Sequence, residues 1–514
     1  MPNLLFTTPR LSTLTRFLAL ALGISLALTG CSAPVLPAID VKYAKYYEQV
    51  VVWTACGTGL RCTTAMAPLD WNQPQGVTIT LALVKRQALG TRRGSILVNP
   101  GGPGESGVAM ITDSVDAVDA TLRKNFDIVG FDPRGVGKST PVSCFTAAEK
   151  DRYLYGIVPG DIGSDQWIDG KTIVEQSYAA ACAKNTGPLL AHVDTQSAAR
   201  DLDVLRAILG ETRLNYLGYS YGTFLGTVYA GLFPQRVGRM VFDGIDNPWA
   251  SAAADGKGEA APSDSFESAL HAFLASCVSG STEAVADQSC AYRGSADSAM
   301  TAVAALLSSV SKTPLKNVDD RMLGGSTLYT AITNHLYSLG AWPDLNIMLR
   351  DVQAGDPHTA FESADSANGR GGDGGYEGNS SDAFRAINCL DGTAGGDPLA
   401  MKEQAAELVK GAPVFGIYEA YGALDCSSWS AAAKPMMDPV TAEGAAPILL
   451  LGTTNDPATP YEDAQALAEQ LSDGHLVTYT GEGHTAYNLG NSCVDNAVDR
   501  YFVSGTVPDS DPKC

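Results

Sequence analysis

Short apolar segments alternate with amphipathic segments at both ends of the chain. Runs of strand length, each ended by Gly, Pro, Asn or Asp or followed by polar residues, cover residues 77–86, 95–99, 126–131, 213–217, 240–245, 446–452 and 475–479. Between them, residues 195–210 carry Ala198, Leu202, Leu205 and Leu209 on one helical face. Strands that alternate with helices at this spacing predict an α/β fold, with a mostly parallel sheet covered by helices on both faces.

The pattern changes between about residues 250 and 430, where strand signals almost vanish. Amphipathic helices are expected at residues 265–278, 296–310, 326–339 and 344–352, and a glycine-rich loop follows at 368–375. We interpret this region as a helical lid inserted into the α/β domain. The predicted boundaries are a signal peptide at 1–30, a tether at 31–45, the α/β core at 46–248 and 431–514, and the lid at 249–430.

The N-terminal segment is typical of a protein that is exported. Arg10 and Arg16 precede an apolar run at 17–28 that is too short for a stable membrane span, which indicates a signal peptide. The run ends in Leu28-Thr-Gly-Cys31, which resembles a bacterial lipobox and implies cleavage before Cys31 and lipid attachment to its sulfur. We therefore expect a protein anchored to the outer face of the cytoplasmic membrane, with a soluble secreted form as the alternative.

Cysteine number and net charge narrow the class of protein further. Without Cys31, ten of the 11 cysteines remain, an even number that suggests up to five disulfides in an exported chain. Sequence proximity favours the first two of the following pairs, and chain order allows the other three: Cys56–Cys62, Cys277–Cys290, Cys144–Cys182, Cys389–Cys426 and Cys493–Cys514. The formal net charge of −21 argues against a nucleic-acid partner, because phosphates would be repelled.

The most informative stretch is Gly218-Tyr-Ser-Tyr-Gly222, which lies between a predicted strand and a predicted helix at 223–233. A strand, a Gly-x-Ser-x-Gly turn and a helix are the parts of a nucleophile elbow, in which the two glycines avoid backbone collisions. The pentapeptide alone is a weak signal in a glycine-rich chain. Its position makes Ser220 the candidate nucleophile.

A serine hydroxyl needs a base and a group that orients the base, and each should follow a later strand. His484 follows the last predicted strand and has glycine at 483, so it is the candidate base. Asp456 follows the preceding strand and is the candidate acid. Asp243 and Asp246 follow the strand after the elbow and remain alternatives for the acid.

Two backbone N–H groups are candidates for stabilising an oxyanion. One belongs to Tyr221, directly after the nucleophile. The other belongs to Gly102, in the loop Pro100-Gly-Gly-Pro-Gly104, although this loop could also be only a tight turn. A phosphate-binding loop at 135–140 is rejected, because Asp132 occupies the position of its first glycine. No metal site and no cofactor are expected.

Taken together, several motifs resemble the secreted tripeptidyl aminopeptidases, which are lidded α/β-hydrolases related to prolyl iminopeptidases. The resemblance covers residues 45–250 and 430–505 and is carried by the motifs Asn99-Pro-Gly-Gly-Pro-Gly, Asp132-Pro-Arg-Gly, Gly218-Tyr-Ser-Tyr-Gly222, Asp456-Pro-x-Thr-Pro460 and Gly483-His484. It implies acyl transfer through Ser220 and release of short peptides from free N-termini. It also implies acidic residues that bind the substrate ammonium group; Glu105 and Asp391 are candidates, and a purely structural role is the alternative for each.

Two other functions remain open at this point. A carboxylesterase or lipase would have the same catalytic residues and differ only in the pocket beneath the lid. A surface lipoprotein that only binds would keep the fold without the chemistry. We expect peptide substrates with a free N-terminus, membrane contact only through the lipid on Cys31, and a monomer.

Overall fold

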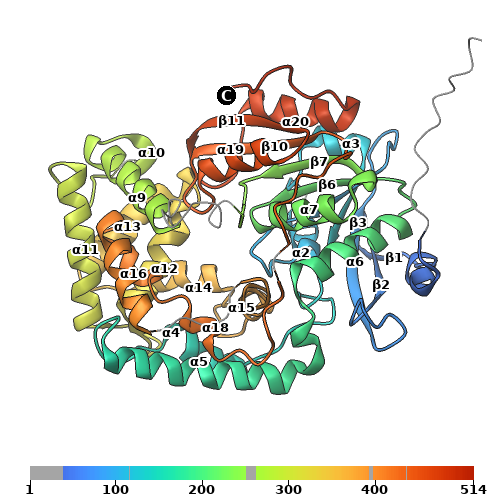
Figure 1. Cartoon of the computed structure of the whole chain (residues 1–514). Helices are drawn as coiled ribbons and strands as arrows, with labels where there is room; N and C mark the ends of the chain where they lie inside the picture. The colour runs from blue at the N-terminus through green and yellow to red at the C-terminus, as the bar shows by residue number, and fades with distance from the viewer. Residues whose placement is uncertain (1–38, 115, 250–261, 287, 393–397, 436) are drawn as a thin grey trace, which may run out of the picture. The chain divides into compact units, whose positions relative to one another are not determined.

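The core of the protein is a mixed β-sheet, seen in a computed structural model that describes residues 39–114, 116–249, 262–286, 288–392, 398–435 and 437–514. Within these residues, nine strands form one sheet in the order β1-β2-β3-β5-β4-β6-β7-β10-β11 (Figure 1). Their bounds are β1 (Thr54–Gly57), β2 (Leu60–Pro68), β3 (Thr78–Arg86), β4 (Ser95–Asn99), β5 (Asp127–Phe131), β6 (Leu214–Tyr219), β7 (Val237–Asp243), β10 (Ile448–Asn455) and β11 (Gly474–Glu482).

The sheet is parallel from β5 through β11 and antiparallel at the end formed by β1, β2 and β3. Every residue of β4 and β5 is buried, as expected for strands covered on both faces. Because the parallel strands point the same way, the loops after β4, β6, β7, β10 and β11 leave the sheet at one edge. That edge is where a doubly covered α/β sheet places its ligands.

Helices cover both faces of the sheet, and a separate apolar core lies beneath each layer. One layer contains α6 (Thr195–Ile208), α7 (Tyr221–Leu232) and α19 (Tyr461–Gln470), and the other contains α2 (Gly107–Asp113), α3 (Ala120–Asn125) and α20 (Ser492–Ser504). This arrangement confirms the predicted α/β-hydrolase fold. Short helices lie at η1 (Val41–Tyr43), α1 (Ala44–Tyr47), η2 (Gly187–Ala191) and η3 (Pro234–Arg236).

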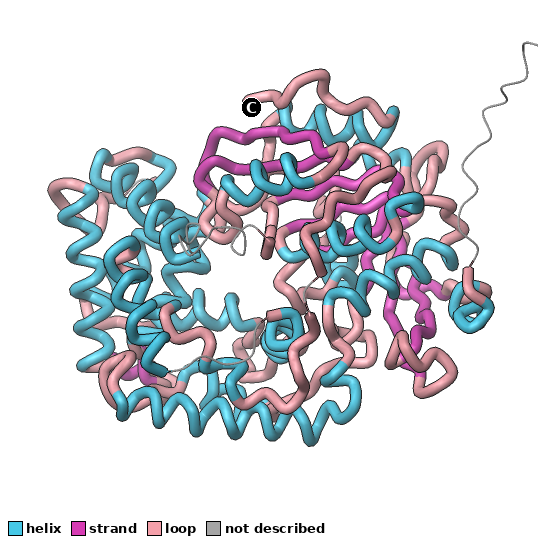
Figure 2. Tube along the Cα trace, viewed as in Figure 1, coloured by secondary structure: helices cyan, strands magenta, loops and turns pink. Residues whose placement is uncertain are grey.

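A second group of helices has its own apolar core and stands to one side of the sheet (Figure 2). It contains α9 (Pro262–Ser279), α10 (Thr282–Val285), α11 (Ala296–Lys312), α12 (Gly325–Leu336), η4 (Leu339–Ala341), α13 (Trp342–Gln353) and α14 (His358–Asn368), with a small hairpin of β8 (Leu315–Lys316) and β9 (Met322–Leu323). These helices lie within residues 249–430, the region predicted to be a lid. Tyr155, from α4 (Ala147–Tyr155), is buried in the same core although α4 precedes the elbow in the sequence.

The long helix α5 (Asp165–Thr186) and a second set of helices complete the lid side of the molecule. Helix α5 packs against α16 (Pro398–Gly411), α17 (Gly416–Glu419) and α18 (Leu424–Ser427) in a further small apolar cluster. The predicted boundaries of the lid at 249 and 430 stay a prediction. The structure adds that α4 and α5, which precede residue 249, pack against helices that follow it.

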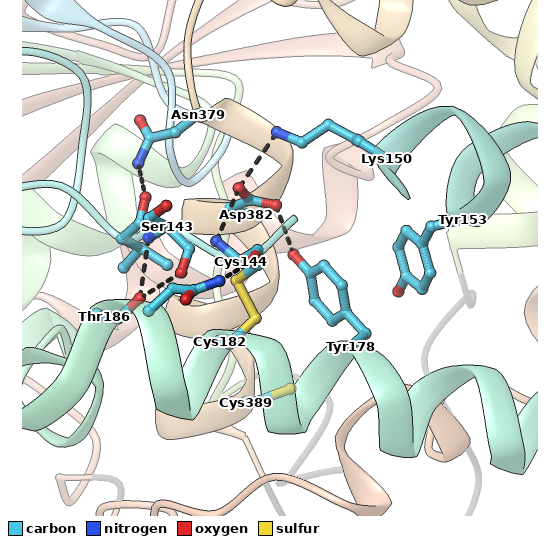
Figure 3. Close-up of a disulfide and its surroundings, with 12 residues drawn as sticks. Ser143, Cys144, Lys150, Tyr153, Tyr178, Cys182, Thr186, Asn379, Asp382 and Cys389 are labelled. Atoms are coloured by element: carbon cyan, nitrogen blue, oxygen red, sulfur yellow. Dashed lines mark hydrogen bonds and ion pairs between the residues drawn. A yellow bond between two sulfur atoms is a disulfide. The ribbon is translucent and has the colours of Figure 1, made fainter. Parts of the chain in front are cut away.

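Helix α15 (Ser380–Asp391) packs into the main core with one side and lines a cavity with another. Its Asp382 is buried, accepts a hydrogen bond from the Tyr178 hydroxyl at 2.9 Å and pairs with Lys150 Nζ at 3.2 Å (Figure 3). Just before the helix, Asn379 donates to the carbonyl oxygen of Val142 at 2.7 Å. A charged and hydrogen-bonded anchor of this kind fixes the orientation of α15.

The five expected disulfides are all formed: Cys56–Cys62, Cys144–Cys182, Cys277–Cys290, Cys389–Cys426 and Cys493–Cys514. Two of them cross-link the region around α15, since Cys144 is joined to α5 and Cys389 to α18. The predicted signal peptide and Cys31 lie outside the described residues. Within the described residues, no helix is both long enough and apolar enough to span a bilayer.

Candidate active site

Ser220 lies at a strained turn between β6, which ends at Tyr219, and α7, which begins at Tyr221. Its φ of 54° and ψ of −129° are unusual for a residue with a side chain. A Cβ on Gly218 would lie 2.5 Å from the carbonyl oxygen of Gly222, and one on Gly222 would lie 2.8 Å from Asn99 Oδ1. The two glycines therefore allow the close packing that holds Ser220 in this conformation.

His484 follows β11 and is bound by the carboxylate of Asp456, which follows β10. The distances from His484 Nδ1 to the two carboxylate oxygens of Asp456 are 2.8 and 2.9 Å. Asp456 is only 2 % exposed and also accepts hydrogen bonds from the backbone N–H groups of Ala458, Thr459 and Thr485. A carboxylate held in this way places the proton on Nδ1 and leaves the lone pair of Nε2 available.

The imidazole of His484 is nearly enclosed, with 11 % of its side chain exposed. Burial lowers the pKa of His484, but the charge of Asp456 and the hydrogen bond to it outweigh burial, so the pKa lies above its ordinary value. Nε2 has no hydrogen-bond partner among the described residues, so it is not yet bonded to Ser220 here. Catalytic contacts of this type often form only with substrate.

The two alternative acids have other roles. Asp243 is fully buried and accepts hydrogen bonds from the backbone N–H groups of Ala486 and Tyr487, both at 2.9 Å, so it holds the loop that follows His484. Burial raises the pKa of Asp243 to about 6. Asp246 lies near the same site, and burial raises its pKa to about 6 as well. Of these three carboxylates, only that of Asp456 is hydrogen-bonded to the imidazole of His484.

The loop after β4 passes directly over the elbow. A Cβ on Gly101 would lie 2.5 Å from the carbonyl oxygen of Tyr219 and 2.8 Å from Ser220 Cβ, so only bare backbone fits there. Gly102 has a φ of 104° and lines the same cavity as Ser220. Tyr221 is the first residue of α7, where backbone N–H groups have no partner within the helix. Tyr221 thus directly follows the serine and Gly102 shares its cavity, while their role as oxyanion donors stays a prediction.

Ser220 and His484 line a cavity of about 510 Å³, which we call the catalytic cavity. Its other walls come from the loop at 100–105, from α12 and from α15. A volume of this size suits a ligand of several residues. Lid residue Tyr337 closes one side: its carbonyl oxygen accepts the backbone N–H of His484 at 2.8 Å, and its ring meets the imidazole edge-on with centroids 5.3 Å apart.

The two predicted ammonium-binding carboxylates occupy different places. Glu105 lines the catalytic cavity and is exposed there; partial desolvation raises its pKa, and a hydrogen bond from Ser380 partly opposes that effect. Asp391 does not line this cavity. It accepts the backbone N–H of Thr195 at 2.9 Å and the Thr195 hydroxyl at 2.6 Å, and that hydroxyl contacts the hydroxyl of Tyr221. Burial raises the pKa of Asp391 to about 7.

Several lining residues carry no signal in the sequence. Tyr337, Phe384 and Arg385 lie on or beside lid helices and have no motif of their own. Asp132, which replaces the first glycine of the rejected phosphate-binding loop, has a structural role. Its carboxylate accepts hydrogen bonds from the backbone N–H groups of Val108 and Lys138.

Among the described residues, no group of three or more His, Cys, Asp and Glu side chains is placed to hold a metal ion. The strained serine and the carboxylate-bound histidine line one cavity at the carboxyl edge of an α/β sheet. A fold and site of this kind define a serine hydrolase.

Comparison with known proteins agrees with that class. The model of the alpha/beta hydrolase fold matches residues 94–274, and the model described as TAP-like protein matches residues 412–514. Serine protease Hip1 of Mycobacterium tuberculosis is 32% identical and covers 96% of both chains. Carboxylesterase B of the same species is 37% identical over 88% of this chain and 86% of its own. Tripeptidyl aminopeptidase of Streptomyces lividans is 32% identical over 88% of this chain and 83% of its own. The chain therefore belongs to the TAP-like α/β-hydrolases, the family of the tripeptidyl aminopeptidases.

Proposed function

We propose that this serine hydrolase is an exported exopeptidase that releases short peptides, tripeptides in particular, from free N-termini. The observation that carries the proposal is the position of Glu105. Of the described residues that line the catalytic cavity with Ser220, Glu105 is the only carboxylate. A carboxylate in a partly enclosed cavity attracts an ammonium group, and the N-terminus of a peptide supplies one.

In this proposal Ser220 Oγ attacks the scissile carbonyl while Nε2 of His484 takes its proton. Asp456 keeps the other proton on Nδ1 and stabilises the imidazolium that forms. His484 then protonates the leaving amine, which departs and leaves an acyl group on Ser220. Water, activated by the same histidine, hydrolyses this ester and restores the serine.

The oxyanion that forms in both steps would accept hydrogen bonds from the backbone N–H groups of Tyr221 and Gly102. Each donor of this kind typically contributes about 10²–10³-fold to kcat. Asp391 supports this arrangement from behind, since Thr195 links it to the side chain of Tyr221. Asp391 is therefore proposed to position the elbow rather than to bind the ammonium group.

Export is supported by the five disulfides, which persist in oxidising compartments. Lipid attachment at Cys31 and anchoring to the outer face of the membrane remain proposals from the sequence. A chain of net charge −21 on the outside of a cell would stay soluble apart from its anchor.

A carboxylesterase is the second candidate, because Carboxylesterase B is among the similar proteins and the same catalytic residues would serve it. The two candidates differ in what the cavity requires of the substrate. An esterase needs no ammonium group, whereas the proposed peptidase needs one next to Glu105.

The test compares a tripeptide carrying a fluorogenic amide with the same compound N-acetylated, using protein that begins after Cys31. We expect kcat/KM to be at least about tenfold higher for the free amine, since a charge-assisted hydrogen bond is lost on acetylation. Glu105→Gln should remove that preference, whereas Glu403→Gln on the exposed face of α16 should not. Equal cleavage of both compounds, or turnover of simple esters only, would contradict the proposal.

A further inference from the structure

The catalytic cavity adjoins a second cavity of about 390 Å³. The two share Tyr153, Leu154 and Arg385 as lining residues, so they meet at one wall. The second cavity is enclosed by the end of α4, the loop before α5, one side of α5 and the start of α12. Because Arg385 lines both cavities, a substrate group can reach it from the side of Ser220.

The charges that line the second cavity are all positive. Its described lining residues include Arg152, Lys171 and Arg385 and no Asp or Glu. This composition is unusual in a chain with a net charge of −21. The cavity therefore attracts anions, whereas the part of the catalytic cavity beside Glu105 attracts cations.

A helix terminus adds to the positive character of the second cavity. Residues 324–327, the beginning of α12, lie in its wall. The residue that precedes the helix is Gly324, so no side chain caps the first N–H groups. Uncapped N–H groups and the helix dipole favour a negative group at this position.

Two of the three cations that line the second cavity pair with carboxylates behind them. Arg385 pairs with Asp425, and Lys171 pairs with Asp425 at 3.1 Å and with Glu175. Arg152, the third cation, is exposed to solvent. Burial lowers the pKa of Lys171 although Glu175 acts in the opposite direction. A guanidinium has five N–H donors, so Arg385 can bind Asp425 and a ligand together.

We propose that the second cavity binds a carboxylate of the peptide substrate, through Arg385, Lys171 and the start of α12. This inference rests on the proposed peptidase function. The ammonium end is drawn to Glu105 and repelled by the second cavity, so the two charged ends orient the peptide across Ser220. The carboxylate comes either from the C-terminus of a short peptide or from an acidic side chain on the leaving side.

The wall between the cavities is held firmly in place. Tyr153 stacks on Tyr178 with ring centroids 4.3 Å apart, and the hydroxyl of Tyr178 donates to Asp382 of α15 (Figure 3). Arg385 is one turn further along α15 and is fixed by the same helix. The site is thus formed before substrate binds, and little ordering is required of it.

The inference is tested with three pentapeptides that share a free N-terminus and the same first three residues. One has a free C-terminal carboxylate, one is the C-terminal amide, and one is that amide with glutamate at its last position. Loss of a charge-assisted contact predicts kcat/KM about tenfold lower for the plain amide than for the free acid. If the glutamate amide is cleaved as well as the free acid, a side-chain carboxylate is sufficient for binding in the second cavity. If it is cleaved as poorly as the plain amide, the second cavity requires the C-terminal carboxylate.

Variants then assign the effect to this cavity. Arg385→Gln combined with Asp425→Asn removes a cation and its partner together and should bring the ratio of free acid to amide close to one. Lys171→Gln with Glu175→Gln serves as a second pair, should the first variant fold poorly. Lys410→Gln, at an exposed position on α16, should keep the ratio of the wild type.

The outcomes separate this inference from the proposed function. Equal cleavage of free acid and amide by the wild type would overturn the carboxylate site, even if N-acetylation still blocks cleavage. A ratio that survives in both double variants would overturn it as well. Equal cleavage of acetylated and free peptides would instead contradict the peptidase proposal.

Discussion

At the scale of single residues, two buried carboxylates illustrate how contacts decide function. Asp243 and Asp456 follow the neighbouring strands β7 and β10 and are both almost fully buried. Asp456 accepts hydrogen bonds from the imidazole of His484, whereas Asp243 accepts them from the backbone of the next loop. The first carboxylate thus fixes the tautomer of His484, and the second holds the loop that follows His484.

Asp456→Asn should lower kcat by about 10³–10⁴-fold, because an amide favours the wrong tautomer of His484. Asp243→Asn should lower the free energy of unfolding by about 1–3 kcal/mol, since an amide cannot accept both backbone N–H groups equally well. The comparison measures kcat and the thermal unfolding temperature for both variants. A larger loss of kcat in Asp243→Asn would reverse the assignment.

The pH dependence of kcat/KM should follow His484. A base must be neutral, and the pKa of His484 is raised because Asp456 outweighs burial. Activity should therefore increase with rising pH through a value above the ordinary 6.5 of histidine. Measuring kcat/KM between pH 5 and pH 9 tests this increase. An activity that is already maximal at pH 6 would contradict the account.

At the scale of elements, helix α15 contacts both the main core and the catalytic cavity. Ala383, Ala386 and Leu390 pack into the main core, while Phe384 and Arg385 line the catalytic cavity. Its last residue, Asp391, binds Thr195 at the start of α6. A shift of this helix would therefore move both the cavity wall and the support of the elbow.

Replacing Cys389 and Cys426 by serine should destabilise the protein and impair catalysis. Their disulfide joins α15 to α18 across a sequence separation of 37, and the chain-entropy argument gives about 4 kcal/mol for such a loop. The pair Cys56 and Cys62, separated by 6, is the control; about 2 kcal/mol and unchanged kcat are expected. Denaturant unfolding and kcat are measured for both double variants. Equal losses of stability and kcat in the two variants would contradict this role of α15.

The sequence predicted the elements with a regular apolar pattern and missed those without one. β4 begins and ends where expected, at 95 and 99, because its apolar run is short and bounded. Helix α5 gave no signal, since its buried positions include Glu175 and Cys182 beside Ile168 and Tyr178. Burial of Glu175 depends on Lys171 and on the hydroxyl of Tyr153, and the latter contact cannot be read from spacing.

The same limit applies to the site. Ser220, Asp456 and His484 were proposed from their positions after strands, which parallel topology brings together at one edge. The structure binds Asp456 to His484 and gives Ser220 and His484 a common cavity; their catalytic roles stay predictions. Asp391 and Glu105 were equal candidates in sequence, and only three-dimensional packing separates them. Arg385 was missed because one arginine on a helix has no distinguishing pattern.

At the scale of the whole molecule, buried acids couple folding to pH. Burial raises the pKa of Asp391 to about 7 and those of Asp243 and Asp246 to about 6, from an ordinary 3.8. A raised carboxyl pKa means that the folded state binds the proton more tightly, so stability falls as pH rises from 3.8 through the folded value. The raised pKa of His484 acts in the same direction above 6.5.

The protein should therefore unfold at a higher temperature at pH 5 than at pH 8. Relief of repulsion in a chain of charge −21 adds to this trend. His192 and His335, whose pKa values burial lowers, oppose it below 6.5. The measurement is the thermal unfolding temperature between pH 5 and pH 8. Asp391→Asn should make this temperature depend less on pH. Greater stability at pH 8 would contradict the assigned shifts.

The measurement that tests the central claim most directly is mass spectrometry of the acyl-enzyme. The protein would be mixed with a free-amine tripeptide ester, quenched in acid within one turnover and digested. We predict the mass of one tripeptidyl group on the peptide that contains Ser220, and no adduct from the N-acetylated ester. An adduct on another residue, no adduct at all, or equal labelling by both esters would contradict the account.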